Sequence, residues 1–163
     1  MRLRPHLAAF AGLVAVACGG SPLGPVVVPP GADVRTAPAT ANLAGQALTL
    51  EAYPWRDFQP GPGSSPDGRP LIVSVRVQAA GGAAVDGGVR ADTMWVVYGD
   101  QAWVAPAVRE QPRAATAPDL EVVARGGPMW GPGAYVDVVV RLRDSSGRAV
   151  LLRAPNQLIH RTD

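Results

Sequence analysis

The chain has 163 residues, with 15 basic residues against 13 acidic ones and a single cysteine. All of the basic residues are arginines, and the formal net charge is +2. This near balance removes the electrostatic basis for nucleic-acid binding, and one cysteine excludes both an internal disulfide and a thiolate metal site.

The first 17 residues have the pattern of a secretion signal. Arg2 and Arg4 precede an uninterrupted apolar run from Leu7 to Ala17, which ends at Cys18. The run is too short for a permanent transmembrane helix, which needs about 20 apolar residues. A basic start followed by a short apolar run and small residues is typical of a cleavable signal peptide. Its removal would leave 13 arginines against 13 acidic residues.

The segment Ala15-Val16-Ala17-Cys18-Gly19 resembles the lipoprotein box of bacterial lipoproteins. The resemblance implies that residues 1–17 are a lipoprotein signal peptide and that Cys18 carries a thioether-linked diacylglycerol as the mature N-terminus. Glycines, not an aspartate, follow the cysteine, which in such lipoproteins favours the outer membrane over the inner one. The alternative is an ordinary signal peptide, cut after Ala17 or Gly20 without lipidation.

Residues 18–42 are expected to form the lipidated cysteine and a flexible tether. Five prolines lie among Gly, Ala, Ser and Thr, and proline disrupts helices and sheet ladders. Treated as a coil, the 24 residues from Gly19 to Asn42 would reach roughly 25–30 Å. Val26–Val28 could instead add an edge strand, although the flanking prolines disfavour it.

From residue 43 to residue 163 the dominant pattern is alternation of apolar and polar residues, which is typical of half-buried strands. In the stretch from Val89 to Tyr98, we expect Val89, Ala91, Thr93, Trp95 and Val97 to share one face. Glycine, proline and aspartate clusters mark the turns between strands. The strands are expected near residues 48–52, 71–79, 89–98, 101–105, 120–124, 136–143 and 149–154, with a short final strand at 158–159.

Seven or so short strands with turns between them predict an all-β, antiparallel β-sandwich. The segment Gly131–Val140, followed by Arg143-Asp144-Ser145-Ser146-Gly147, resembles the penultimate strand and closing turn of bacterial immunoglobulin-like domains, including PKD and fibronectin type III relatives. The resemblance implies an immunoglobulin-like fold for residues 43–163. In that fold Tyr135 would be the corner tyrosine, and Trp95 would lie in the strand that often buries a tryptophan.

The sequence offers few residues for catalysis or metal binding. After signal removal the only histidine is His160, the fourth residue from the C-terminal end, and no G-x-S-x-G motif is present. The three glutamates are far apart in sequence, and the loop aspartates lack the spacing of a calcium loop. We therefore expect no enzyme activity, no cofactor and no metal site.

Aromatic residues are the remaining candidates for ligand contact. Tyr53 and Trp55 lie near a strand end, and Trp103 and Trp130 lie in a strand and in a Gly/Pro loop. Flat rings at such positions bind sugars or proteins in some modules, although for each of them burial in the core is favoured.

The sequence therefore predicts a lipid-anchored protein of the bacterial cell envelope, attached to the membrane through its N-terminus. Its sandwich domain would bind an envelope protein or glycan, or act as an accessory subunit, without catalysis. Two alternatives remain open. One is a secreted carbohydrate-binding module without a lipid, and the other is a periplasmic hydrolase that uses aspartates gathered by folding.

Overall fold

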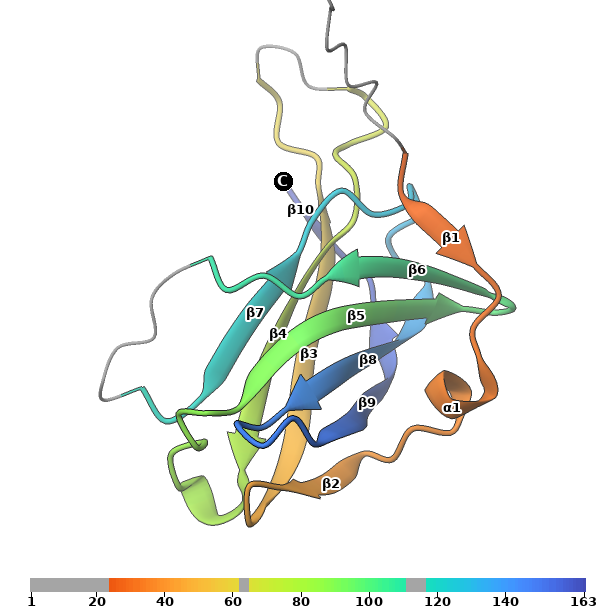
Figure 1. Cartoon of the computed structure of the whole chain (residues 1–163). Coiled ribbons are helices and arrows are strands. Elements are labelled where there is room, and N and C mark those ends of the chain that lie inside the picture. The colour runs from red at the N-terminus through yellow and green to blue at the C-terminus, as the bar shows by residue number, and fades with distance from the viewer. Residues whose placement is uncertain (1–23, 62–64, 111–116) are drawn as a thin grey trace, which may run out of the picture.

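The computed structural model describes residues 24–61, 65–110 and 117–163, which form two five-stranded sheets packed face to face (Figure 1). Every strand pairing is antiparallel except that of β10 with β3. Sheet A has the order β1 (Val26–Val28), β6 (Gln101–Pro106), β5 (Arg90–Tyr98), β8 (Tyr135–Arg143) and β9 (Ala149–Leu158). Sheet B has the order β10 (His160–Thr162), β3 (Gln46–Asp57), β4 (Ile72–Ala79) and β7 (Leu120–Ala124), and β2 (Thr40–Leu43) also pairs with β3.

The core lies between the two sheets and follows from the alternation in the sequence. Successive strand residues point to opposite faces, so every second apolar residue reaches the core. Val73, Val75 and Val77 of sheet B are fully buried there, as are Val138 and Val140 of sheet A. The prediction of an all-β sandwich is confirmed, and all seven expected strands are present as β3 to β9.

The seven expected strands divide between the two sheets. β3, β4 and β7 are successive neighbours in sheet B, and β9, β8, β5 and β6 are successive neighbours in sheet A. Three short strands, β1, β2 and β10, are added at the sheet edges. The ten strands of the described residues therefore contain the expected seven and extend both sheets.

Most of the expected tether belongs to the folded domain, so that prediction is wrong for residues 26–42. β1 pairs with β6, with Val26 opposite Val104, and α1 (Ala32–Arg35) lies over sheet A. Val34 and Ala37 pack on Val139 on the outer face of that sheet. Proline removes only its own N–H donor, so three valines between prolines can still pair along a sheet edge.

Part-way along β5, the alternating set of residues that faces the core changes. The pairing of β5 with β8 shifts by one residue between Ala91 and Thr93, which marks a β-bulge. Met94 and Val96 consequently face the core, whereas Trp95 is half-buried on the outer face. The prediction that Trp95 and Val97 share a face with Val89 and Ala91 is therefore wrong, and Trp95 is not a buried core tryptophan.

Two other aromatic residues also differ from expectation. Tyr135, at the start of β8, is 57% exposed and so does not pack as a corner tyrosine. Trp103 is 2% exposed in the core, which excludes it from ligand contact. The backbone of Gly127 lies directly against its ring, where a Cβ atom would come within 2.6 Å of a ring carbon.

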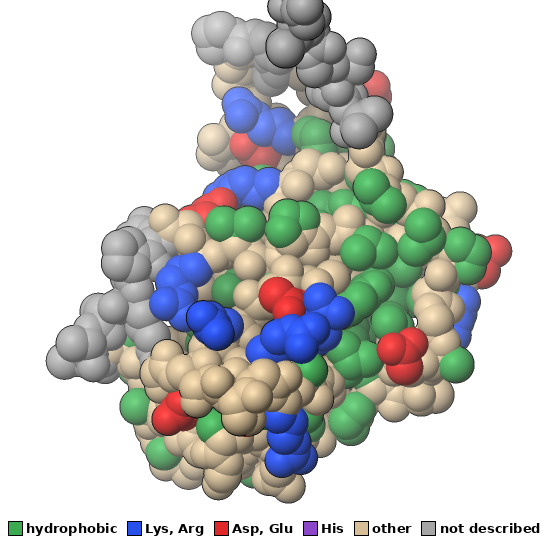
Figure 2. All heavy atoms as spheres, in the orientation of Figure 1, with side chains coloured by type: hydrophobic (Ala, Val, Ile, Leu, Met, Phe, Trp, Pro, Cys, Tyr) green, Lys and Arg blue, Asp and Glu red, His purple; other side chains and the backbone are tan. Residues whose placement is uncertain are grey.

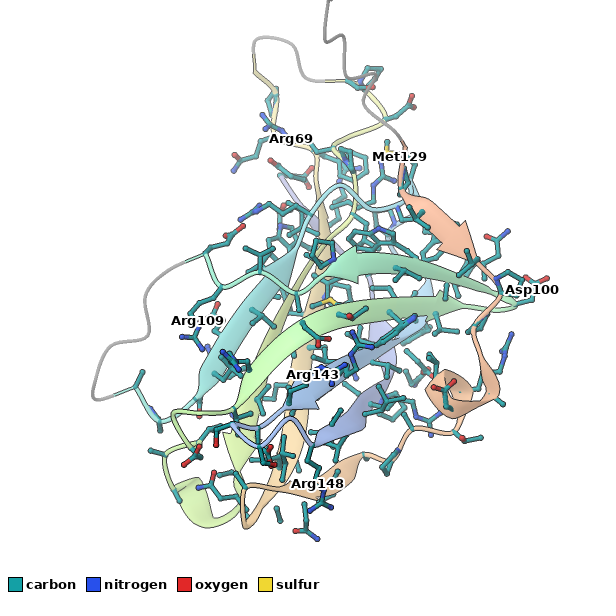
Figure 3. All side chains as sticks on the ribbon, viewed as in Figure 1. Arg69, Asp100, Arg109, Met129, Arg143 and Arg148 are labelled. Atoms are coloured by element: carbon teal, nitrogen blue, oxygen red, sulfur yellow. The ribbon has the colours of Figure 1, made fainter. Side chains whose placement is uncertain are left out.

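Arg56 is the one charged side chain that is buried among the described residues, at 4% exposed. Its guanidinium donates to the carbonyl oxygens of Arg69 at 2.9 Å and of Met129 at 3.2 Å, and also to that of Asp67. It lies over the Phe58 ring, 5.1 Å from the centroid. Arg56 thereby joins two loops at one end of the sandwich, where Figure 3 shows Arg69 and Met129.

Candidate binding surface

An aromatic cluster of Tyr53, Trp55 and His160 lies on the outer face of sheet B. Tyr53 and Trp55 are two residues apart on β3, so their side chains leave the same face of the strand. His160 is the direct neighbour of Trp55 on the parallel strand β10. The rings of Tyr53 and His160 stack with centroids 4.6 Å apart, and those of Tyr53 and Trp55 are tilted at 5.6 Å.

Tyr53 is the exposed member of this aromatic cluster. It is 47% exposed, whereas Trp55 and His160 are half-buried. The His160 imidazole stacks on one side of the Tyr53 phenol ring and restricts the orientation of that ring. Tyr53 therefore loses little further side-chain entropy when a ligand stacks on its other side. An exposed flat ring that is held in place can stack against a flat apolar face of a ligand.

A hollow of about 450 Å³ opens beside Tyr53. Its volume is within the range of small-ligand sites. Polar side chains on its wall offer hydrogen bonds next to the ring, and they come from three strands: Glu51, Ser74, Arg76 and Gln157.

The polar groups of this hollow are ordered by cross-strand contacts. Arg76 lies 3.7 Å from Glu51 and 3.5 Å from Asp119, and the Ser74 hydroxyl donates to Glu121 at 3.3 Å. These contacts are exposed to solvent, so each contributes little to stability. They place donors and acceptors next to one another, where a hydroxyl-rich ligand could bind.

The edge of β3 is incomplete beside the hollow. β2 pairs with Gln46–Thr49 and β10 pairs with Trp55–Asp57. Neither of these ladders includes the segment from Leu50 to Pro54, which pairs with β4 on its other side. The interruption leaves room at the edge, and four of the residues that line the hollow come from this segment.

A second, smaller hollow of about 330 Å³ lies between α1 and sheet A. Arg153 donates to the Arg35 carbonyl at 3.0 Å and to Asp137 at 3.4 Å, while the backbone N–H of Asn156 donates to Asp137 at 2.7 Å. Asn156 has a φ of 57° at the irregular pairing of β8 with β9. These polar groups contact one another, and we interpret them as the connection of α1 to the sheet.

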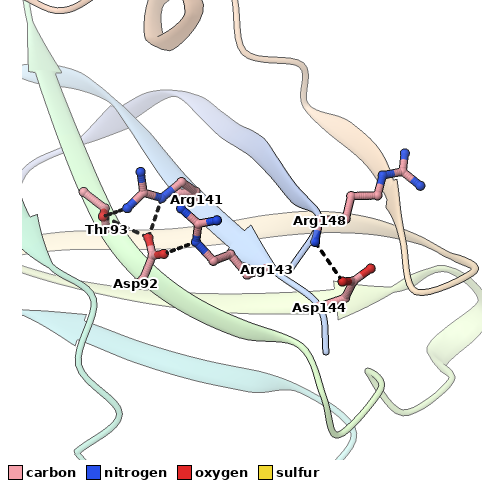
Figure 4. Close-up of polar contacts among 6 residues, drawn as sticks. All are labelled: Asp92, Thr93, Arg141, Arg143, Asp144 and Arg148. Atoms are coloured by element: carbon pink, nitrogen blue, oxygen red, sulfur yellow. Dashed lines mark hydrogen bonds and ion pairs between the residues drawn. The ribbon is translucent and has the colours of Figure 1, made fainter. Parts of the chain in front are cut away.

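A cluster of charged residues lies on the outer face of sheet A (Figures 2 and 4). The carboxylate of Asp92 accepts from Nε of Arg141 and from Nε of Arg143, both at 2.6 Å, and from the Thr93 hydroxyl at 2.9 Å. Partial burial by itself raises the pKa of Asp92, but the hydrogen bonds from the arginines and the threonine outweigh it and lower the pKa. The carboxylate stays ionised and joins β5 to β8.

Replacing Asp92 with asparagine should therefore destabilise the protein in a pH-dependent way. Because the pKa is lower in the folded state, the contribution is present above the unfolded pKa of about 4 and is lost as the pH falls through the folded value. We expect a loss of about 1 kcal/mol at pH 7, limited by solvent screening, that shrinks in acid. Urea denaturation at pH 7 and pH 3 measures it. Equal losses at both pH values would contradict this account, and Asp100→Asn in the β5–β6 turn is the control.

The structure thus brings together only two of the four aromatic candidates, Tyr53 and Trp55. Trp130 lies elsewhere, with its ring centroid 5.4 Å from that of Tyr98. His160 is not among the residues that the sequence suggests for ligand contact, yet it belongs to the aromatic cluster. Cys18, the expected lipidation site, lies outside the described residues.

No three His, Cys, Asp or Glu side chains in residues 24–61, 65–110 and 117–163 lie close enough to hold a metal ion. Hydrogen bonds from Arg125 and Arg161 lower the pKa of Glu110 and Asp163, and those from Ser146 lower the pKa of Asp144. A general acid needs a raised pKa, so these carboxyl groups and Asp92 are unsuited to that role. Within the same residues, no helix has the length and apolarity to span a bilayer.

No protein-family model, curated protein or solved structure matches the chain.

Proposed function

We propose that the chain is a lipid-anchored protein of the bacterial envelope whose sandwich domain binds a glycan through the aromatic cluster of sheet B, without catalysis. The observation that supports the binding role best is Tyr53, an exposed ring stacked on His160 beside a polar hollow. Sugar rings have flat apolar faces and many hydroxyls, and this surface offers a flat ring together with hydrogen-bonding side chains.

The proposed anchor is a diacylglycerol on Cys18, which rests on the likeness of residues 15–19 to a lipoprotein box. The glycines after Cys18 favour the outer membrane within this proposal. The strand order of β3 to β9 also supports kinship with bacterial immunoglobulin-like domains of the PKD and fibronectin type III kind. Such folds carry many functions, so the binding role is argued from Tyr53 and not from the fold.

Tyr53→Ala is expected to weaken glycan binding by on the order of tenfold, because a stacked ring contributes about 1.4 kcal/mol. Sedimentation with purified peptidoglycan, together with a panel of soluble envelope polysaccharides, measures the binding. Tyr135→Ala is the matched control, since Tyr135 is also exposed but lies on sheet A. If both variants bind like the unaltered protein, or if no glycan is bound, the proposed role of Tyr53 is wrong.

A further inference from the structure

We infer that the anchored protein rests one defined end of its sandwich against the lipid bilayer. This end, called the tether end here, comprises the start of β1 at Val26, the loop residues Arg69 and Met129, and β10. The opposite end, with the β8–β9 turn at Ser145, faces away from the membrane. The inference rests on the proposed function, because it takes the lipid on Cys18 as the point of attachment.

The short connection between the lipid and the fold is the first argument. β1 begins at Val26, so only residues 19–25 separate the folded strand from Cys18. Eight Cα–Cα steps span at most about 28 Å when fully extended and about 16 Å as a coil. The 24-residue tether expected from the sequence would have reached much further.

The position of β1 along the molecule is the second argument. In Figure 3 the start of β1 lies at the same end as Arg69 and Met129, and Arg148 of the β8–β9 turn lies at the opposite end. β3 runs between the two ends with 12 residues, which at about 3.3 Å each gives a length of about 40 Å. An inverted orientation would hold Val26 about 40 Å from the bilayer, farther than the connection can reach.

The surface of the tether end is compatible with lipid headgroups. Val26 is 59% exposed and Met129 is 48% exposed, so apolar atoms already face outward there. Arg69 pairs with Asp57 at 3.4 Å, and Arg161 pairs with Asp163 at 2.7 Å. These pairs leave little net charge for attraction to anionic lipid or repulsion from it, so the connection and not electrostatics sets the orientation.

This orientation also places the proposed glycan site. Tyr53 lies four residues before Asp57, the last residue of β3, and therefore about 13 Å from the tether end. A ligand stacked on Tyr53 would be bound on the flank of the domain, close to the membrane surface.

The inference can be tested with the lipidated full chain in vesicles of phosphatidylethanolamine and phosphatidylglycerol. An acylated Cys18 leaves no free thiol, so Gln59→Cys at the tether end and Ser145→Cys at the far end each give one site for a fluorophore. A nitroxide on the lipid headgroup quenches nearby dyes. We expect quenching at position 59 to exceed that at position 145 several-fold.

Inserting 20 Gly/Ser residues after Ser21 serves as the control, and the longer connection should remove most of the difference between the two labels. Equal quenching in the unextended protein, or stronger quenching at position 145, would overturn the inference while leaving the anchor intact. Failure of the protein to float with the vesicles would instead overturn the anchor, and the inference with it.

Discussion

Replacing Arg56 with methionine is expected to lower the free energy of unfolding by about 3 kcal/mol. Methionine fills most of the volume but donates no hydrogen bonds, so the carbonyls of Asp67, Arg69 and Met129 lose their partner. An unsatisfied buried carbonyl costs about 1–3 kcal/mol, and partial hydration of the two loops limits the total cost for the three carbonyls. Burial lowers the pKa of Arg56, an effect that the nearby Asp67 charge partly offsets, and the guanidinium remains cationic.

Urea denaturation at pH 7 measures this loss, with Arg76→Met as the matched control. Within the part of the chain that the structure describes, Arg76 pairs with Glu51 and Asp119 while its own side chain is 50% exposed, so its replacement should change stability by less than about 0.5 kcal/mol. Arg56→Lys should recover only part of the stability, because an ammonium group cannot reproduce the planar fork that reaches three carbonyls. A loss below about 1 kcal/mol in Arg56→Met would show that the two loops do not depend on this side chain.

Replacing Cys18 with serine is expected to transfer the protein almost completely out of the membrane fraction. Stable membrane attachment requires two anchoring signals, such as two acyl chains, and a diacylglycerol supplies two acyl chains. Serine has no thiol to carry the lipid. Fractionation of cells followed by immunoblotting measures the distribution.

Ser21→Ala is the control for this substitution, since it alters a small neighbouring residue and keeps the cysteine. It should remain with the membranes. Retention of Cys18→Ser in the membrane fraction would show that the attachment has another origin.

Much of the fold could be predicted from the sequence because its main signal is local. In a strand such as β4, valines at every second position are enough to indicate which face is buried. The turns could also be predicted. Gly99 and Gly147 have positive φ and lie in the β5–β6 and β8–β9 turns, where the sequence predicts hairpins.

The errors arose where the decisive contact is non-local. The segment around Val26–Val28 has a composition typical of a linker, and only the exposed edge of β6 makes it a strand. The bulge in β5 moves Trp95 to the outer face, and the alternation of residues around it does not indicate the bulge. In both cases the partner strand, and not the segment itself, determines the structure.

The candidate site could be predicted only where its residues are close together in the sequence. Tyr53 and Trp55 share a face because they are two residues apart, which the sequence shows directly. His160 reaches them through a parallel pairing with a strand more than 100 residues earlier, and no local pattern reveals such a pairing. Trp103 lies in the core with the backbone of Gly127 against its ring, a contact that its neighbours in the sequence do not reveal.

Intact-mass spectrometry of the protein purified from its native membrane tests the central claim most directly. The account predicts a mature chain that begins at Cys18 and carries the added mass of a thioether-linked diacylglycerol. A chain that retains residues 1–17 would contradict it. So would a chain that begins at another residue, whether Cys18 is present with an unmodified thiol or has been removed.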